Sequence, residues 1–223
     1  MAVPEQRRAL LVALSVAQAV VGIGLSALGW GGLRALLAHP ARAAFVVLSI
    51  VLTLVALLSP ANLSSGERED VETRRLFAPA AAGVLLLAWL MPFMDRRDLW
   101  TIDGDVVRYL GVAALVIGGT LRVWPIFVLG RRFSGLVAIQ PGHELVTDGP
   151  YRHLRHPSYL GLMLGFVGWA LVFRSSAGLV AALLGLRLLF ERIDSEEALL
   201  ASRFGDAYAD YRRRSWRLVP WLY

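Results

Sequence analysis

The sequence has no cysteine and no lysine, and each absence excludes a class of chemistry. Without cysteine there are no disulfides, no thiolate metal sites and no cysteine nucleophile. Without lysine there is no Schiff base, and every one of the 23 basic residues is an arginine. Charge is scarce as well, because only 18% of the 223 residues are charged, whereas about a quarter are charged in a typical soluble domain. The composition therefore indicates a membrane protein.

The uncharged runs of the sequence are long enough to cross a bilayer as helices, which takes about 20 apolar residues. The long uncharged runs cover residues 9–30, 43–58 and 76–94, and a fourth apolar run, 106–129, has Arg108 near its start and is interrupted by Arg122. Shorter apolar runs over 157–173 and 175–190 predict a tight helical hairpin, and a charged amphipathic helix is expected over 193–214. We therefore expect an all-α polytopic integral membrane protein with about six transmembrane helices, a final short hairpin and an amphipathic C-terminal helix.

Arginine counts predict the orientation of these helices. If the N-terminus is cytoplasmic and six helices alternate, fifteen arginines face the cytoplasm and six face the other side. Two more, Arg122 and Arg187, fall inside helices. This asymmetry satisfies the positive-inside rule and places both termini in the cytoplasm, at the inner membrane if the source is bacterial. Membrane topology thus accounts for the net charge of +6, and we expect no nucleic-acid partner.

The segment GPYRHLRHPSYLG, which starts at Gly149, places basic residues at the start of a membrane helix. The preceding aspartate and the Gly-Pro pair are a turn signal, and Pro157 fits the first turn of the helix. A helix N-terminus offers free N–H groups and a partial positive charge. The side chains around it are those of Arg152, His153, Arg155 and His156. The pattern predicts an anion site for a carboxylate or phosphate; the alternative is that these arginines anchor the chain at lipid headgroups.

Two adjacent carboxylates, Glu196 and Glu197, follow the last predicted membrane helix. On a helix they cannot both face away from the protein, so at least one is expected to face residues 152–156. A carboxylate opposite arginines and histidines suits a zwitterionic ligand, because it accepts from an ammonium while the cations hold a carboxylate. A plain salt bridge between helices is the alternative. The aromatic residues expected to lie at the membrane interface are Trp216, Trp221 and Tyr223.

Three other kinds of functional site are considered: a charged residue inside the membrane, a metal site and the known nucleotide or metalloprotease motifs. Arg122 lies inside a predicted membrane helix, where an arginine is costly and is usually functional, paired or able to reach the interface. His143, His153 and His156 could in principle hold a metal, but their cationic neighbours disfavour a divalent ion, so we expect none. The sequence has no P-loop, no GxGxxG and no HExxH motif.

Three stretches of the second half form a specific combination: LGRRFS, IQPGHELVTDGPYRHLRHPSYLG and EEALLASRFGDAYADYRRR. RHPxYxG is followed by paired glutamates and then by an FGxxYxxY tail. From about residue 121 to the C-terminus, this combination resembles the isoprenylcysteine carboxyl methyltransferase family, and the wider group of membrane methyltransferases that includes phospholipid methyltransferases. The resemblance implies one membrane domain, 1–223, with N-terminal helices over 1–105 and a methyltransferase core with the cofactor site over 106–223.

The resemblance also implies a cofactor and its residues. Enzymes of this family bind S-adenosylmethionine (SAM) in a pocket that faces the cytoplasm and has no Rossmann fold. A lipophilic substrate enters from the bilayer, so this substrate and membrane lipids are the expected partners. Carried over by position, the cofactor site comprises His143, Leu145, Val146, Gly149, Tyr151, Arg152, His153, Arg155, His156, Pro157, Tyr159, Gly161, Glu196 and Glu197.

The identity of the methyl acceptor decides which residues are catalytic. A carboxylate acceptor needs a cation to hold it, and Arg122 or Arg131 is the candidate. A phospholipid amine or a small thiol needs a base, for which Glu196 or Glu197 is the candidate. Two other functions stay open. One is an NADPH-dependent reductase of the sterol-reductase kind, against which Leu162 stands where those enzymes usually carry an acidic residue. The other is a non-catalytic membrane scaffold.

Overall fold

The structure, a computed structural model, describes residues 5–58, 68–69, 77–130, 138–139 and 145–221. Its helices are α1 (Glu5–Trp30), α2 (Leu33–Leu37), α3 (Pro40–Leu58), α5 (Phe77–Arg96), α6 (Asp105–Leu129), the short 3₁₀ helix η2 (Gly149–Arg152), α7 (Pro157–Val172), α8 (Ser176–Phe204) and α9 (Asp206–Arg213). Strands β1 (Arg68–Glu69) and β2 (Ala138–Ile139) pair antiparallel over two residues each. The described part is therefore helical, as predicted, apart from this one short pairing.

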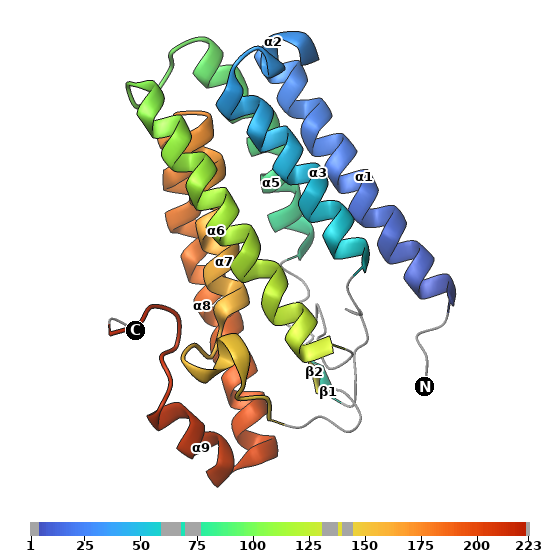
Figure 1. The fold of residues 1–223 in the computed structure, drawn as a ribbon, viewed down its shortest axis with the longest axis vertical. Coiled ribbons are helices and arrows are strands. Elements are labelled where there is room, and N and C mark those ends of the chain that lie inside the picture. The colour runs from blue at the N-terminus through green and yellow to red at the C-terminus, as the bar shows by residue number, and fades with distance from the viewer. Residues whose placement is uncertain (1–4, 59–67, 70–76, 131–137, 140–144, 222–223) are drawn as a thin grey trace.

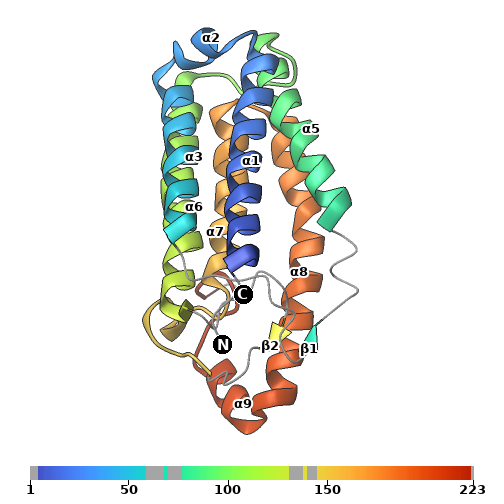
Figure 2. The same cartoon turned by 90° about the vertical axis from the view of Figure 1, so that its right-hand side faces the viewer.

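The long helices form an elongated bundle in which each packs on its neighbours. α1 packs against α5 and α3, α3 against α6, α6 against α7, and α7 against α8. Figures 1 and 2 show α2 at one end of this bundle and η2, α9 and the two short strands at the other. The basic connector before α7 and the C-terminal helix α9 thus lie at the same end, as a shared site requires.

Three helices in the described part are long and apolar enough to cross a membrane: Val12–Trp30, Pro40–Leu58 and Asp105–Leu129. Pro157–Val172 is a shorter apolar helix. The helical, membrane-embedded character predicted from the uncharged runs is therefore confirmed. The count of about six transmembrane helices is not reached by length and composition alone, and it stays a prediction.

The second helix of the predicted hairpin is much longer than the sequence suggested. We expected it to end at residue 190 and a separate amphipathic helix to cover 193–214, but α8 runs unbroken from Ser176 to Phe204. The residues between the two predicted helices include neither glycine nor proline, so nothing there ends the helix. The break comes at Gly205, whose φ of 50° is the left-handed conformation that glycine adopts readily. Glu196 and Glu197 therefore lie within a continuous helix and not at the start of a new one.

Helices α6 and α7 touch backbone to backbone through glycines. A Cβ added at Gly118 would lie 2.6 Å from a backbone nitrogen of α7, and one at Gly168 would lie 2.7 Å from the carbonyl oxygen of Gly111. At Gly161 it would lie 2.4 Å from the backbone nitrogen of Arg122. The glycines recur at intervals of seven residues on each helix, which keeps them on one face. Small residues allow such close approach in membrane bundles, where packing drives helix association.

A buried ion-pair cluster closes the opposite end of the bundle. The side chain of Asp95 at the end of α5 has no exposed surface. Its oxygens accept from Arg108 Nη1 at 2.5 Å and Nη2 at 2.9 Å, and from Arg174 Nε at 2.8 Å. Arg174 lies in the turn between α7 and α8. The two arginines, which the sequence suggested only as charges outside the membrane, are therefore partners of one carboxylate that joins α5, α6 and the hairpin turn.

The glycine contact can be tested by replacing Gly168 with alanine. The new Cβ would lie 2.7 Å from the backbone nitrogen of Leu115 as well as from Gly111, so the helices must separate. We expect Gly168→Ala to lower the free energy of unfolding by about 1–3 kcal/mol, the usual cost of overpacking. The measurement is the thermal midpoint of the solubilised protein. Gly165→Ala is the matched control, because its Cβ meets nothing within 4 Å; equal midpoints would contradict the close contact.

The cluster around Asp95 can be tested in the same assay. Asp95→Asn keeps the shape of the side chain but leaves Arg108 and Arg174 with only the exposed carboxylates of Asp105 and Asp98, so the loss of the buried charge should cost about 3 kcal/mol. Asp98→Asn is the control, because Asp98 pairs with the same Arg174 through a side chain that is 74% exposed. An exposed pair is worth at most about 1 kcal/mol. If both variants lost the same small amount of stability, the buried ion pair would not be what holds this end of the bundle together.

Candidate active site

The connector before α7 is held in place by the C-terminal segment. The backbone N–H of Trp216 donates to the carbonyl of His153 at 2.8 Å, and the N–H of Arg155 donates to the carbonyl of Trp216 at 2.8 Å. The N–H of His156 donates to the carbonyl of Arg217 at 3.1 Å. These bonds pair a short stretch of the tail with the connector like two parallel strands.

Helix α7 begins at Pro157, as the sequence predicted. Part of the N–H capacity expected at this helix end is used within the helix, however. The N–H groups of Tyr159 and Leu160 both donate to the carbonyl of His156, at 3.1 Å each. Because Tyr159 and Leu160 use their N–H groups within the helix, an anion here would depend mainly on the surrounding side chains.

The Glu197 carboxylate is the centre of the site. Its Oε1 accepts from Arg155 Nε at 2.8 Å and lies 3.2 Å from His156 Nε2. Arg217 Nε lies 3.4 Å from the same oxygen. The side chain of Glu197 is 9% exposed. The prediction that one of the two adjacent glutamates faces the connector is therefore confirmed, and that glutamate is Glu197.

This environment keeps Glu197 ionised. Burial by itself would raise the pKa of the carboxyl group. The hydrogen bonds from His156 and Arg155, together with their charges, outweigh burial and lower the pKa to about 2. A carboxylate with so low a pKa binds cations well and accepts protons poorly.

Glu196 takes part in a second, neighbouring cluster. Its Oε2 accepts from the hydroxyl of Tyr159 at 2.8 Å, and Arg192 Nε donates to the same hydroxyl oxygen at 2.7 Å. The Arg192 guanidinium also lies 5.8 Å from the centre of the Tyr159 ring. Sequence reasoning treated Arg192 only as a cytoplasmic charge. Its position four residues before Glu196, on the same face of a helix, was the signal that could have placed it here.

Arg122 reaches this region from the middle of α6. Its Nη1 donates to Ser158 Oγ at 2.7 Å, and that hydroxyl lies 3.3 Å from the Arg122 carbonyl, to which it donates in return. No carboxylate lies within ion-pair distance of Arg122 in the residues that the structure describes. Arg122 is therefore a cation directed at α7, next to the cluster of Tyr159 and Arg192.

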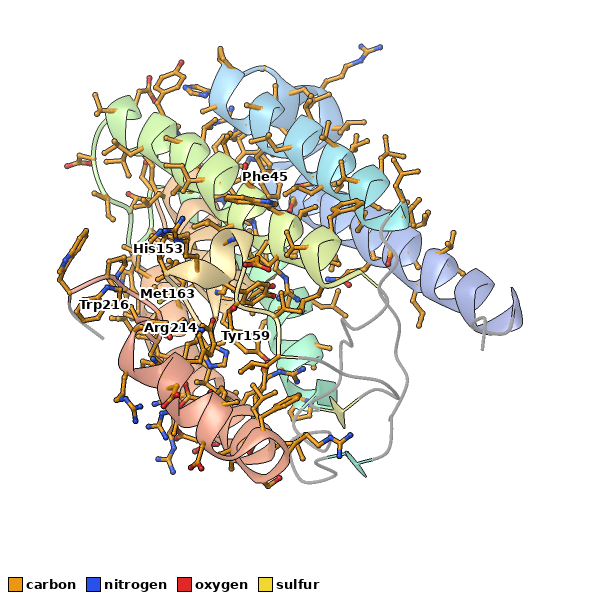
Figure 3. All side chains as sticks on the ribbon, turned by 60° about the horizontal axis from the view of Figure 1, so that its bottom comes forward. Phe45, His153, Tyr159, Met163, Arg214 and Trp216 are labelled. Atoms are coloured by element: carbon orange, nitrogen blue, oxygen red, sulfur yellow. The ribbon has the colours of Figure 1, made fainter. Side chains whose placement is uncertain are left out.

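The remaining predicted site residues lie around these clusters. Tyr151 is buried in η2, and its carbonyl accepts from the Tyr211 hydroxyl of α9 at 2.7 Å. Figure 3 shows Trp216 at the outer edge of the molecule and Tyr159 further inside. Leu145 and Val146 are half-buried, and Gly149, Arg152 and His153 are exposed. Two predicted residues, Arg131 and His143, lie outside the described residues.

Sequence reasoning placed the C-terminal helix at the site but did not identify the contacts that its residues make there. Arg155 Nη1 donates to the carbonyls of Ser215 and Arg212. The FGxxYxxY stretch supplies Tyr211 to hold η2, while the predicted helix over 193–214 accounted for it only as an apolar face. The signal available in the sequence was the spacing of the tyrosines, which pointed to packing but not to a partner.

The ionised state of Glu197 makes the stability of the fold depend on pH. Its pKa falls from an ordinary 4.5 to about 2 on folding, so its contribution is complete above about pH 4.5 and is lost as the pH falls toward 2. The largest possible contribution is about 3 kcal/mol. We expect Glu197→Gln to be less stable than the unmodified protein at pH 7, with the difference shrinking between about pH 4.5 and 3. Thermal midpoints across this range test it; a constant difference would contradict an ionised Glu197.

Comparisons with known proteins point to one family. The model of the isoprenylcysteine carboxyl methyltransferase (ICMT) family matches residues 110–202. The chain is 35% identical to protein-S-isoprenylcysteine O-methyltransferase B of Arabidopsis thaliana over 139 residues, which is 61% of this chain and 68% of that protein. It is 37% identical to the protein-S-isoprenylcysteine O-methyltransferase of Schizosaccharomyces pombe over 113 residues, which is 49% of this chain and 48% of that one.

A solved structure shares the fold. The structure of a eukaryotic intramembrane Ras methyltransferase, ICMT, matches with a TM-score of 0.59 at 22% identity, over 96% of this chain and 75% of that one. The region matched by the family model, residues 110–202, contains α7, most of α8, and both glutamates of the site. The chain belongs to the isoprenylcysteine carboxyl methyltransferase family of membrane O-methyltransferases.

Proposed function

We propose that this protein transfers a methyl group from SAM to the carboxylate of a lipophilic acceptor at the cytoplasmic face of the membrane. The observation that carries the proposal is the cluster of Arg155, His156 and Glu197, which the connector and α8 form together. It lies in the part of the chain that the family model matches. The curated relatives are named as protein-S-isoprenylcysteine O-methyltransferases, so an isoprenoid acid is the first acceptor to test.

The residues of the site fit the methionine part of SAM, which carries an ammonium and a carboxylate. Glu197 Oε1 lies within 3.4 Å of nitrogens of Arg155, His156 and Arg217, while Oε2 accepts no hydrogen bond from the residues that the structure describes. This oxygen suits the ammonium of the cofactor, and the exposed side chains of Arg152 and His153 can donate to its carboxylate. When bound, SAM supplies an activated methyl group.

The full set of residues proposed to hold the cofactor is the one inferred from the sequence: His143, Leu145, Val146, Gly149, Tyr151, Arg152, His153, Arg155, His156, Pro157, Tyr159, Gly161, Glu196 and Glu197. The backbone pairing of the tail with the connector fixes the central members of this set. Their task is to orient the two reactants and exclude water, which supplies most of the acceleration in a displacement of this kind.

A carboxylate acceptor suits the site better than an amine or a thiol. A carboxylate attacks without losing a proton, whereas an amine or thiol needs a base. Glu197 is a weak base because its pKa is lowered to about 2. Arg122, which has no carboxylate partner in the described part of the chain, is the cation that we propose for holding the acceptor carboxylate, with Arg192 beside it. Arg131 was the other candidate from the sequence, and it lies outside the described residues.

The proposed placement in the membrane follows the arginine distribution. We propose that α5, α7 and the first half of α8 accompany the three long apolar helices in the bilayer, which gives the six helices expected from the sequence, with both termini in the cytoplasm. The outer face of α8 supports this, because Leu183 and Leu184 are 65% and 72% exposed. Residues 106–223 then form the methyltransferase core of a single membrane domain, and the lipophilic acceptor enters from the bilayer.

Binding and turnover with a defined acceptor test the proposal. We expect the purified protein to bind labelled SAM and to methylate a farnesylated cysteine derivative that has a free carboxylate, but not the matching amide. Arg122→Gln should keep the Kd for SAM within about twofold and lower kcat/KM for the acceptor about 100-fold, because it removes a buried charge-assisted contact. Arg187→Gln is the control, since Arg187 is an exposed arginine of α8, 86% exposed, and should change neither.

Two outcomes would overturn the proposal. If the unmodified protein bound no SAM in a native-like bilayer, the cofactor assignment would fail. If SAM bound but an amine were methylated and the acid were not, the proposal of a carboxylate acceptor would be wrong. A residue other than Glu197 would then have to act as the base.

A further inference from the structure

The C-terminal segment Ser215–Leu218 lies beyond the motifs of the sequence and beyond the residues matched by the family model, yet it touches the centre of the site. Its backbone makes three hydrogen bonds to the connector, at 2.8, 2.8 and 3.1 Å. One of them joins the carbonyl of Arg217 to the N–H of His156. The tail therefore fixes the same connector residues that contact Glu197.

The side chain of Arg217 returns to α8 and contacts two carboxylates there. Its Nη2 pairs with Asp194 Oδ1, and its Nε lies 3.4 Å from Glu197 Oε1. Asp194 and Glu197 are three residues apart, so they share one face of α8. The Arg217 side chain is 15% exposed, and that of Asp194 is 65% exposed. Arg217 thus joins the exposed edge of α8 to its buried carboxylate.

The tail has an anchor that does not depend on this arginine. Leu218 is 2% exposed and packs in a cluster with Leu189 and Ile193 of α8. The buried Ser215 hydroxyl donates to the Tyr211 carbonyl at 2.6 Å. Because these contacts hold the segment on both sides of Arg217, a change to its side chain leaves the backbone pairing in place.

We propose that the C-terminal segment is part of the cofactor site and that Arg217 is a positioning residue, which holds Glu197 Oε1 so that Oε2 faces the ammonium of the cofactor. This inference rests on the proposed function, because it takes Glu197 as the acceptor of that ammonium. Arg155 and His156 approach Oε1 from the connector, while Arg217 approaches it from the tail and is tied to α8 through Asp194. Two hydrogen bonds and one ion pair on the same oxygen hold the carboxylate in one orientation, and Oε2 accepts no hydrogen bond from the described residues.

The role has a consequence that separates it from general stabilisation. A residue that only stabilised the fold would affect thermal stability and both substrates alike. A residue that orients Glu197 should change the affinity for SAM, while the acceptor, held by Arg122, should bind as before. The chemical step at saturating SAM should be largely preserved, because Arg217 does not touch the reacting atoms.

The test compares Arg217→Gln with Arg213→Gln, an exposed arginine of α9 that pairs with Asp210 and has a side chain 73% exposed. We expect Arg217→Gln to raise the Kd and KM for SAM about tenfold, the usual size for one charge-assisted contact. The KM for the acceptor and kcat at saturating SAM should stay within about twofold. Arg213→Gln should match the unmodified protein, and Arg217→Lys should recover part of the affinity, since it restores the charge without the fork.

A second variant covers the case in which Arg217→Gln does not fold. Asp194→Asn loosens Arg217 from α8 at an exposed position without touching Glu197, and we expect it to raise the Kd for SAM about threefold. In the double variant, the effect of Asp194→Asn should disappear, because the two residues act through the same contact.

The outcomes distinguish this inference from the function on which it rests. If Glu197→Gln lost SAM affinity while Arg217→Gln and Asp194→Asn bound SAM like the unmodified protein, the role of Arg217 would be overturned and the proposed function would stand. If the unmodified protein bound no SAM, both would fall. A rise in the KM for the acceptor equal to the rise for SAM would also overturn the positioning role.

Discussion

The backbone contact between α6 and α7 is the constraint on which the rest of the structure depends. With glycine at 118 and 161, the two helices approach until a Cβ would lie 2.4 Å from the nitrogen of Arg122. At that distance, the Arg122 guanidinium and the Arg122 carbonyl both contact the hydroxyl of Ser158. Ser158 follows Pro157, the first residue of α7, so the same contact also fixes where the basic connector ends. Helix packing and site geometry are therefore set by one interface.

Each end of the bundle is organised by one buried carboxylate that gathers cations from distant parts of the chain. Asp95 joins Arg108 and Arg174 at one end, and Glu197 joins Arg155 at the other. A lone buried carboxylate would be costly, and a buried arginine equally so. Several partners around one carboxylate offset more of the desolvation free energy, and they satisfy more hydrogen-bonding groups than a single ion pair would. The two clusters differ in completeness: Asp95 uses both oxygens, whereas Glu197 engages its cations through Oε1 alone.

How much of this was predictable depends on whether the determining contact was local in sequence. The uncharged runs predicted the long helices, and Pro157 predicted the start of α7, because hydropathy and proline act over a few residues. The connector and the paired glutamates were predicted to meet, since both stretches carry motifs at one end of the same hairpin. The continuity of α8 was missed: its sequence turns from apolar to charged at residue 190, but that change marks where the environment of the helix alters and not where its hydrogen bonds stop.

The contacts that were not predicted are those that join residues far apart without a repeating pattern. Arg174 is 79 residues from Asp95, and nothing in the spacing of either residue identifies the other. Counting arginines treated both Arg174 and Arg192 as topology signals, because a count along the chain does not show which way a side chain points. Tertiary packing decides which arginines face lipid headgroups and which turn inward, so the sequence could give the sign of the charge at each end but not its partner.

The arrangement of charge around Tyr159 suggests how an esterified acceptor would leave. Arg122 and Arg192 face this region from α6 and α8, and of the two it is Arg192 that donates to the Tyr159 hydroxyl, which in turn donates to Glu196. The proposed acceptor carboxylate would give Arg122 the counter-charge that the described residues do not provide. Once that carboxylate becomes a methyl ester, it has no charge, and its charge-assisted contact with Arg122 is lost. The same buried cation would thus favour binding of the acid over the ester, so that release of the product follows from the chemistry without any movement of the protein.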